Sequence, residues 1–203
     1  MSPEESAAVG AEDELAPRQL TEAQELRALT HPVRLALLEV LSLEGPLTAT
    51  EAGERIGESP TTCSFHLRQL AKYGFVEEAG GGGGRRRPWK LTRRGLSFSG
   101  EGDAEQSIAA KELSNLLMQR WLVRHDAWQA VAHLEPEWLP VTGATEHTVF
   151  LTLEETTVLQ AEIAGLFRRF AGRLSDPSGR PPGARPVEAV LLLHPLLERA
   201  PRS

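Results

Sequence analysis

The stretch SPTTCSFHLRQL (59–70) carries side chains suited to contacting nucleic acid, arranged at the spacing of one helix face. Ser59 is in N-cap position, Pro60 suits the first helical turn, and apolar residues recur every three or four positions to give one buried stripe. The other side chains point away from this stripe: Thr61, Thr62, Ser64, Phe65 and Arg68. Hydroxyl groups can contact bases or phosphates, and an arginine can neutralise a phosphate. The alternative is an amphipathic helix with an ordinary solvent-facing side.

A basic stretch, GGGGGRRRPWKLTRR (80–94), follows soon afterwards. A mononucleotide-binding loop needs Lys and then Ser or Thr after its last glycine, whereas this run of glycines ends in Arg85, Arg86 and Arg87. The run also lacks the glycine spacing of a dinucleotide-binding loop. Glycines give a mobile tip without side chains, and arginines supply charge that can follow a phosphate backbone or a narrow minor groove. The stretch therefore predicts contact with nucleic acid and not a nucleotide pocket.

Enzymatic and metal chemistry lack the residues that they need. Cys63 is the only cysteine, whereas a thiolate metal site needs several converging cysteines or histidines. GLSFSG (95–100) resembles a nucleophile elbow but has no glycine two residues after Ser97. His125 and His133 point in different directions from one helix, so that helix alone does not bring them to one ion. We expect no enzymatic activity, no metal site and no cofactor.

Aromatic side chains form a further candidate group around Trp121, His125 and Trp128. The two tryptophans are separated by two helical turns and therefore share one face of a helix. The simpler interpretation is packing in a core or a dimer interface. The alternative hypothesis is an aromatic-lined pocket for a small, non-metal effector.

Charge is distributed unevenly along the chain. A net charge of −6 over 203 residues argues against a uniformly basic surface. However, residues 1–16 carry acids and no base, whereas residues 85–94 carry bases and no acid, and a local patch sets the field at a surface. No stretch approaches the ~20 apolar residues of a membrane-spanning helix, and the N-terminus lacks a secretory pattern. Since a single cysteine suits a reducing compartment, we expect a cytoplasmic protein.

Short elements in residues 20–97 would position the polar helix and the basic stretch. Residues 1–19 predict a disordered acidic tail. Two short helices are expected to meet near Thr30, a third to span TATEAGERIG (48–57), and the polar helix to end at Gly74. FVEEA (75–79) and RPWKL (87–91) are typical of a hairpin with the glycine run at its tip.

A Gly/Ser-rich link (95–102) leads to a second region. Within the helix expected at 103–135, residues 105–134 hold the longest helical pattern, about 45 Å at ~1.5 Å per residue, which is too long for a small domain to cover. In residues 145–197, strand patterns at 147–153 and 187–193 flank a helix that starts with a capping box at Thr152 and Glu155. We expect a mainly α fold with small β elements, ending in a small βαβ-like α/β unit that serves dimerisation or effector binding.

The runs HPVRLALLEVL, IGESPTTCSFHLRQLAKYGFVEE and WKLTRRG resemble the ArsR-type winged helix–turn–helix transcriptional regulators over residues 20–97. The resemblance implies that residues 59–70 are the recognition helix, that the Gly/Arg hairpin is the wing, and that the helix at 103–135 pairs with its twin in a homodimer. It implies these contacts to double-stranded DNA: Ser59, Thr61, Thr62, Ser64, Phe65 and Arg68 from the helix, and Arg85, Arg86 and Arg87 from the wing. His66 matches a family histidine that more often supports helix packing. TATEAGERIG lacks the cysteines of metal-sensing members.

These observations predict a homodimeric DNA-binding transcriptional regulator, more a repressor than an activator. It would bind an inverted-repeat operator and respond to a small non-metal effector, without a membrane contact. One rival hypothesis is a winged-helix module for protein–protein interaction, in which the wing and the acidic tail serve a protein partner. Another is a sequence-neutral architectural DNA binder, which the hydroxyl-rich helix face disfavours because such a face offers base readout.

Overall fold

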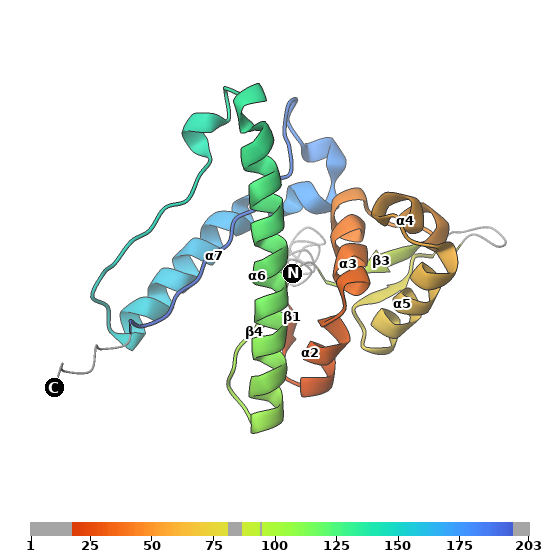
Figure 1. The fold of residues 1–203 in the computed structure, drawn as a ribbon, viewed down its shortest axis with the longest axis horizontal. Coiled ribbons are helices and arrows are strands. Elements are labelled where there is room, and N and C mark those ends of the chain that lie inside the picture. Colours follow the sequence, from red (N-terminus) through yellow and green to blue (C-terminus); the bar gives the residue numbers. More distant parts are fainter. Residues whose placement is uncertain (1–17, 81–86, 94, 197–203) are drawn as a thin grey trace, which may run out of the picture.

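The structure is a computed structural model that describes residues 18–80, 87–93 and 95–196, without the side chains at 174 and 175 (Figure 1). Its elements are mostly helices, with short strands at the N-terminal domain. The expected fold class, mainly α with a winged helix–turn–helix domain, is confirmed.

Local signals set the first helices. Helix α2 (Ala23–Leu29) and helix α3 (Pro32–Glu44) meet at Thr30 and His31, as predicted. The His31 side chain caps α3, because its Nδ1 accepts a hydrogen bond from the Val33 N–H at 3.2 Å. Helix α4 (Ala49–Ile56) begins with a full capping box between Thr48 and Glu51, and helix α5 (Pro60–Lys72) begins at the N-cap Ser59. Thr48 and Ser59 are of the residue types that cap helices in general.

The wing forms from strands β2 (Val76–Glu78) and β3 (Trp89–Leu91), which pair antiparallel with Val76 opposite Leu91. This confirms the predicted hairpin. Leu47 extends it: its N–H donates to the Trp89 carbonyl at 3.0 Å, and its carbonyl accepts from the Trp89 N–H at 2.7 Å. The bridge ties the wing to the segment between α3 and α4. Trp89 is half-buried against the core and anchors the hairpin, as its position suggested.

A second pairing joins residues that were expected to be a tail and a link. Strand β1 (Arg18–Leu20) pairs parallel with strand β4 (Leu96–Phe98), with Arg18 opposite Leu96. The disordered tail predicted at 1–19 therefore ends too late, because Arg18 and Gln19 belong to a strand. The link predicted at 95–102 also contains a strand. Pairing across so long a separation depends on how the domain closes, which local patterns do not reveal. Residues 1–17 lie outside the described part.

Side chains from all these elements share one core. Its largest fully buried side chains come from α2, α3, α5, β1, β2 and the start of the long helix: Leu20, Leu26, Leu29, Leu37, Leu41, Leu67, Leu70, Leu113, Val76 and Cys63. Burying a leucine or valine side chain contributes about 1.5–3 kcal/mol. This core is what holds α5 in place against the rest of the domain.

The long helix α6 (Ala104–Val131), continued by the 3-10 turn η1 (Ala132–Leu134), confirms the helix predicted at 103–135. Its first half belongs to the winged domain, since Ala109, Ala110 and Leu113 are buried and α2 packs against it. Its second half extends past that domain (Figure 1) and exposes Leu122 and Val123. The short turn η2 (Leu139–Val141) follows.

The C-terminal region departs from the expected βαβ-like unit. Helix α7 (Leu153–Ser175) is present with its capping box at Thr152 and Glu155, and the turn η3 (Pro177–Gly179) follows it. The strands expected at 147–153 and 187–193 are wrong: neither segment pairs in a sheet, and residue 153 starts α7. A strand is stable only when a neighbour satisfies its backbone groups, and alternating apolar residues do not supply that neighbour within one chain.

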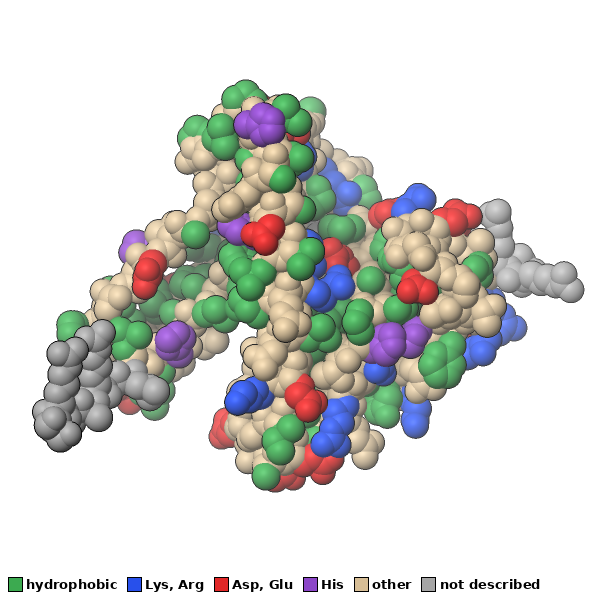
Figure 2. All heavy atoms as spheres, viewed as in Figure 1, with side chains coloured by type: hydrophobic (Ala, Val, Ile, Leu, Met, Phe, Trp, Pro, Cys, Tyr) green, Lys and Arg blue, Asp and Glu red, His purple; other side chains and the backbone are tan. Residues whose placement is uncertain are grey.

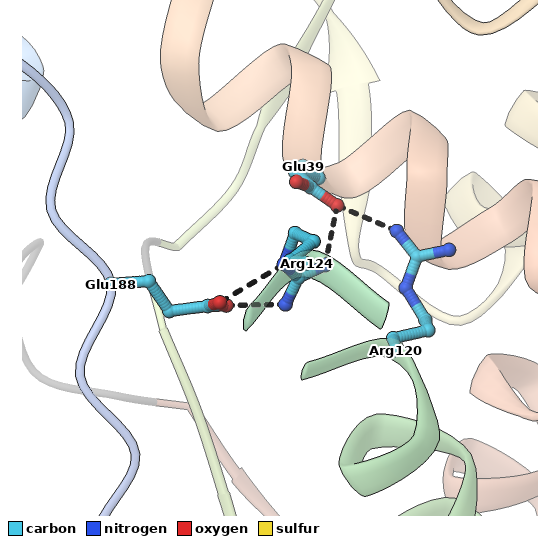
Figure 3. Close-up of polar contacts among 4 residues, drawn as sticks. All are labelled: Glu39, Arg120, Arg124 and Glu188. Carbon is cyan, nitrogen blue, oxygen red and sulfur yellow. Dashed lines mark hydrogen bonds and ion pairs between the residues drawn. The ribbon is translucent and has the colours of Figure 1, made fainter. Parts of the chain in front are cut away.

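An ionic bridge joins the C-terminal segment to the winged domain (Figure 3). Glu39 on α3 accepts from Arg120 at 2.6 Å and from Arg124 at 3.2 Å, both on α6. Arg124 also pairs with Glu188, with its Nε 3.0 Å from the Glu188 Oε2. One arginine therefore contacts carboxylates from both regions. No helix in the described residues is long and apolar enough to cross a membrane.

Candidate nucleic-acid interface

A close approach of α4 and α5 sets the angle of the helix–turn–helix. Gly53 on α4 is buried, and a Cβ at this position would lie 2.6 Å from the Glu58 carbonyl oxygen and 3.5 Å from the Cys63 Sγ. Gly57 ends α4 in the left-handed conformation, with φ of 74°. Only glycine adopts this left-handed backbone conformation without strain, because it has no side chain. The turn is therefore short, and α5 starts directly beside α4.

The inner face of α5 is buried. Cys63, Leu67 and Leu70 are inaccessible to solvent, and burial raises the pKa of the Cys63 thiol. This confirms that Cys63 lies on the apolar stripe. A buried thiol of raised pKa behaves as a small apolar side chain and not as a nucleophile.

The outer face of α5 brings most of the predicted DNA-contacting residues together at the surface. Thr61 and Arg68 are exposed, Ser64 is half-buried, and the Phe65 side chain is 56% exposed. Arg68 has no hydrogen bond or ion pair with any residue that the structure describes. Phe65 touches the rest of the protein edge-on through the His66 ring, at 5.2 Å between centroids. These side chains are available to a partner.

Ser59 and Thr62 also hold the start of the helix. The Ser59 Oγ accepts a hydrogen bond from the Thr62 N–H at 3.0 Å, and the two hydroxyl oxygens lie 2.8 Å apart. The side chain of Ser59 is therefore a cap first. Since a hydroxyl group has one proton to donate and two lone pairs to accept, both residues keep capacity for a further contact.

A pair of histidines lies behind the outer face of α5. The rings of His31 and His66 are 4.3 Å apart, His66 is 8% exposed, and its Nδ1 is buried without a hydrogen-bond partner in the described residues. Burial, His31 and Arg34 lower the pKa of His66, while Glu58 acts in the opposite direction. Burial also lowers the pKa of Arg34. The packing role that the resemblance suggested for His66 agrees with this position.

Sequence patterns did not predict the ring contact of His66 with His31, nor the effect of the Arg34 charge on the pKa of His66. These residues belong to different helices, and only the fold brings them together. The sequence signal for a buried His66 was its helical position, which places it on the same face as Cys63, Leu67 and Leu70.

The wing carries basic side chains beside acids of its own strands. Arg87 lies 3.5 Å from Glu78, and Lys90 lies 3.0 Å from Glu77, in all cases with exposed or half-exposed side chains. Such exposed pairs are weak and exchange readily for another anion. Arg85 and Arg86 lie outside the described residues. Figure 2 shows Lys and Arg side chains along the right-hand edge of this domain.

Two of the three residues predicted to form an aromatic group on α6 contact each other. The rings of Trp121 and His125 stack at 5.0 Å with an interplanar angle of 11°, and Trp128 is half-buried farther along the helix. The His125 Nε2 also lies 2.8 Å from the Gln129 Nε2. Among the described residues, no three His, Cys, Asp or Glu side chains are placed to hold a metal ion.

The comparisons with known proteins agree with the domain seen in the N-terminal half. A family model for a helix–turn–helix domain matches residues 29–79, which run from the end of α2 to the first strand of the wing. No curated protein matches the chain.

Solved structures of regulators show a weak likeness. A MarR family regulator from Neisseria meningitidis shares 18% identity, with a TM-score of 0.32, over 71% of this chain and 79% of its own. A transcriptional regulator from Thermotoga maritima shares 11% with a TM-score of 0.29, over 69% and 77% of the two chains. The C30AH42A mutant of Lactococcus lactis ZitR shares 15% with a TM-score of 0.25, over 82% and 91%.

Those TM-scores are too low to inform the assembly or the ligands of this chain. The domain match and the geometry of α4, α5 and the wing do define the N-terminal half. This chain contains a winged helix–turn–helix domain of the kind that DNA-binding transcriptional regulators use.

Proposed function

We propose that this protein is a sequence-specific transcriptional regulator that reads DNA with α5. The observation that carries the proposal is the division of α5 into a buried face and a free polar face. An α-helix with its side chains is about 10–12 Å across, which fits a major groove about 12 Å wide. The start of α5 lies at the surface, where it can enter a groove without any rearrangement of the core.

The two kinds of side chain on that face have different roles in this proposal. Thr61, Thr62 and Ser64 contact base edges or nearby phosphates through their hydroxyl groups. Arg68 neutralises a phosphate and adds affinity without sequence preference. On the wing, Arg87 exchanges Glu78 for a phosphate, and Arg85 and Arg86 follow the backbone or the minor groove of the flanking DNA.

The protein acts as a homodimer in this proposal and represses the genes beside its operator in the cytoplasm. Two α5 helices related by a twofold axis then occupy successive major grooves, so the operator is an inverted repeat with half-sites about 34–36 Å apart. Exposed apolar side chains on the second half of α6, among them Leu122 and Val123, support a protein contact there. A small non-metal effector binds beside Trp121, His125 and Trp128.

Selection of bound sequences from random DNA tests base readout directly. The full chain should enrich an inverted repeat, and Thr61→Ala should relax the preference at one position of each half-site, by about 1–3 kcal/mol. Lys111→Ala, on the exposed side of α6, is the control and should leave the enriched sequence unchanged.

Two outcomes would contradict the proposal in different ways. Binding that depends on salt but enriches no sequence would indicate a sequence-neutral architectural DNA binder. The absence of any DNA binding at low salt would instead favour the winged-helix protein–protein interaction module.

A further inference from the structure

Helix α7 has an apolar face that the rest of the described chain leaves largely uncovered. No described α7 side chain is buried, and Leu166, Phe167 and Phe170 are each more than half exposed. In proteins most helical stability comes from packing an apolar face, since an isolated helix is marginal in water. A capped helix of 23 residues with such a face is therefore expected to have a partner.

The apolar residues of this face follow a symmetric pattern. Leu159, Ile163, Leu166 and Phe170 are spaced four, three and four residues apart, which is the spacing of a helix–helix seam. Ile163 and Leu166 lie equally far from the midpoint between Ala164 and Gly165, and the other two residues are equally far from it as well. The spacing of these apolar positions is therefore the same from either end of the helix.

The charges beside the seam are antisymmetric about the same midpoint. At about 100° per residue, Glu162 and Arg169 lie on the same flank of the apolar stripe, on opposite sides of the midpoint. Neither has an ion pair with a residue that the structure describes. Glu155 and Arg173 repeat this order farther out on that flank, where Arg173 lies 5.1 Å from the centre of the Phe170 ring. One half of the flank is acidic and the other half is basic.

We propose that α7 packs antiparallel against α7 of a second copy of this chain. In that arrangement Ile163 faces Leu166 of the second copy, Leu159 faces its Phe170, and each Glu162 lies beside an Arg169. A parallel twofold arrangement would set this flank against the opposite, uncharged flank of the second copy, so the charges would lose their partners. The contact is isologous, because the same surface serves both copies, and it closes at two chains. This inference rests on the homodimer of the proposed function and adds α7 to the α6 surface as a contact between the two copies.

The size of the surface suits such a contact. Helix α7 is about 34 Å long at ~1.5 Å per residue, so the seam extends over several helical turns. Phe150, three residues before the helix, is a further fully exposed apolar side chain. A stable interface typically buries about 800 Å² per partner, so the contact has to extend along most of α7.

Sedimentation velocity of the full chain over a range of concentrations is the first test. Leu166→Glu places a charge in the seam, and Arg169→Glu removes the complementary charge beside it. Each should weaken self-association at least tenfold. Arg168→Glu is the matched control: it makes the same charge reversal one residue away, on the far side of the helix, and should leave self-association unchanged.

Mixing two defective variants provides the sharper test. Glu162→Arg and Arg169→Glu should each associate poorly alone, because each creates two like-charge contacts in an antiparallel pair. Mixed in equal amounts, they should form a heterodimer in which both contacts are again attractive. Native mass spectrometry distinguishes the heterodimer from the homodimers by mass. This recovery also excludes misfolding as the reason why either variant fails alone.

The outcomes separate this inference from the proposed function. Dimers that persist in Leu166→Glu, or a mixture that gives no heterodimer, would overturn the α7 contact, while a dimeric wild-type protein that binds its operator would leave the proposed function standing. A wild-type chain that remains monomeric at all concentrations and on DNA would overturn both the α7 contact and the proposed homodimer.

Discussion

At the scale of single residues, Arg68 differs from other arginines of the winged domain in its surroundings. Arg55 and Arg87 each lie beside a carboxylate, of Glu44 and Glu78 respectively, whereas Arg68 has no partner in the described residues. An exposed cation on the outer face of α5 loses no internal contact when it approaches a phosphate. It is therefore better placed than its neighbours to contribute affinity.

Arg68→Ala should weaken binding to all DNA sequences and leave their ranking unchanged. Each neutralised phosphate contributes about 0.9 to the slope of log K against log salt, so the slope should fall by about 1 for each copy bound. Gel shifts at several salt concentrations measure it. Arg55→Ala, on α4 and paired with Glu44, should change the slope less. An unchanged slope in Arg68→Ala would show that this residue does not meet the backbone.

His66 predicts a dependence of folding stability on pH. Burial, His31 and Arg34 hold its pKa below the ordinary value, with Glu58 opposing them. Since the unfolded chain binds the proton more readily, with a pKa near 6.5, the contribution is complete above about pH 6.5 and is lost as the pH falls through that value towards the lower folded pKa. The urea midpoint should therefore decrease more between pH 7.5 and 5.5 in the wild type than in His66→Gln.

A second variant, at a histidine outside the core, is the control for this measurement of pH dependence. His133, exposed in the turn η1 after α6, serves as the control: His133→Gln should keep the pH dependence of the wild type. Equal slopes in His66→Gln and the wild type would assign the pH dependence to other groups.

At the scale of elements, Gly53 decides how closely α4 approaches α5. A Cβ there would lie 2.6 Å from the Glu58 carbonyl oxygen, which is backbone and cannot rotate away. Gly53→Ala should therefore destabilise the domain by about 1–3 kcal/mol, as overpacking in a core does, and lower DNA affinity by tilting α5. Urea unfolding measures the first effect and gel shift the second.

Gly172 gives the matched substitution in another helix. Nothing lies within 4 Å of a Cβ at this position of α7, and alanine favours a helix over glycine by about 1 kcal/mol. Gly172→Ala should therefore cause no loss of stability. A similar loss in both variants would mean that the contact at Gly53 is not what limits the domain.

The elements that could be predicted from the sequence are those with a local cause. Thr48, Ser59 and Thr152 cap the helices that follow them, and Gly57 ends α4, because each effect depends on residues a few positions away. The free face of α5 followed from the same periodicity. The pairing of β1 with β4 and the contact of His31 with His66 join distant segments, and no local pattern specifies them. The strands predicted at 147–153 and 187–193 failed because a strand pattern does not provide a pairing partner.

At the scale of the whole molecule, Arg124 connects the winged domain to the C-terminal segment. Its guanidinium contacts Glu39 of the winged domain and Glu188 of the C-terminal segment (Figure 3). Hydrogen bonding to Glu188 and the charge of Glu39 raise the pKa of Arg124, against the effect of burial. The charge of this side chain is therefore secure, and both carboxylates compete for one cation. Arg120 adds a second contact to Glu39, so Glu39 pairs with two arginines of α6 whereas Glu188 pairs with one.

This asymmetry predicts different effects for the two carboxylates. Glu188→Gln should speed hydrogen exchange in residues 183–196, because their ion pair to α6 is lost, and leave exchange in α3 unchanged. Glu39→Gln removes both arginine contacts and should speed exchange where α3 faces the second half of α6. Because these side chains are partly exposed, each pair contributes only about 0–1 kcal/mol, so the urea midpoint should move little in either variant. Faster exchange throughout the chain in Glu188→Gln would instead mean that the segment is part of one cooperative unit with the winged domain.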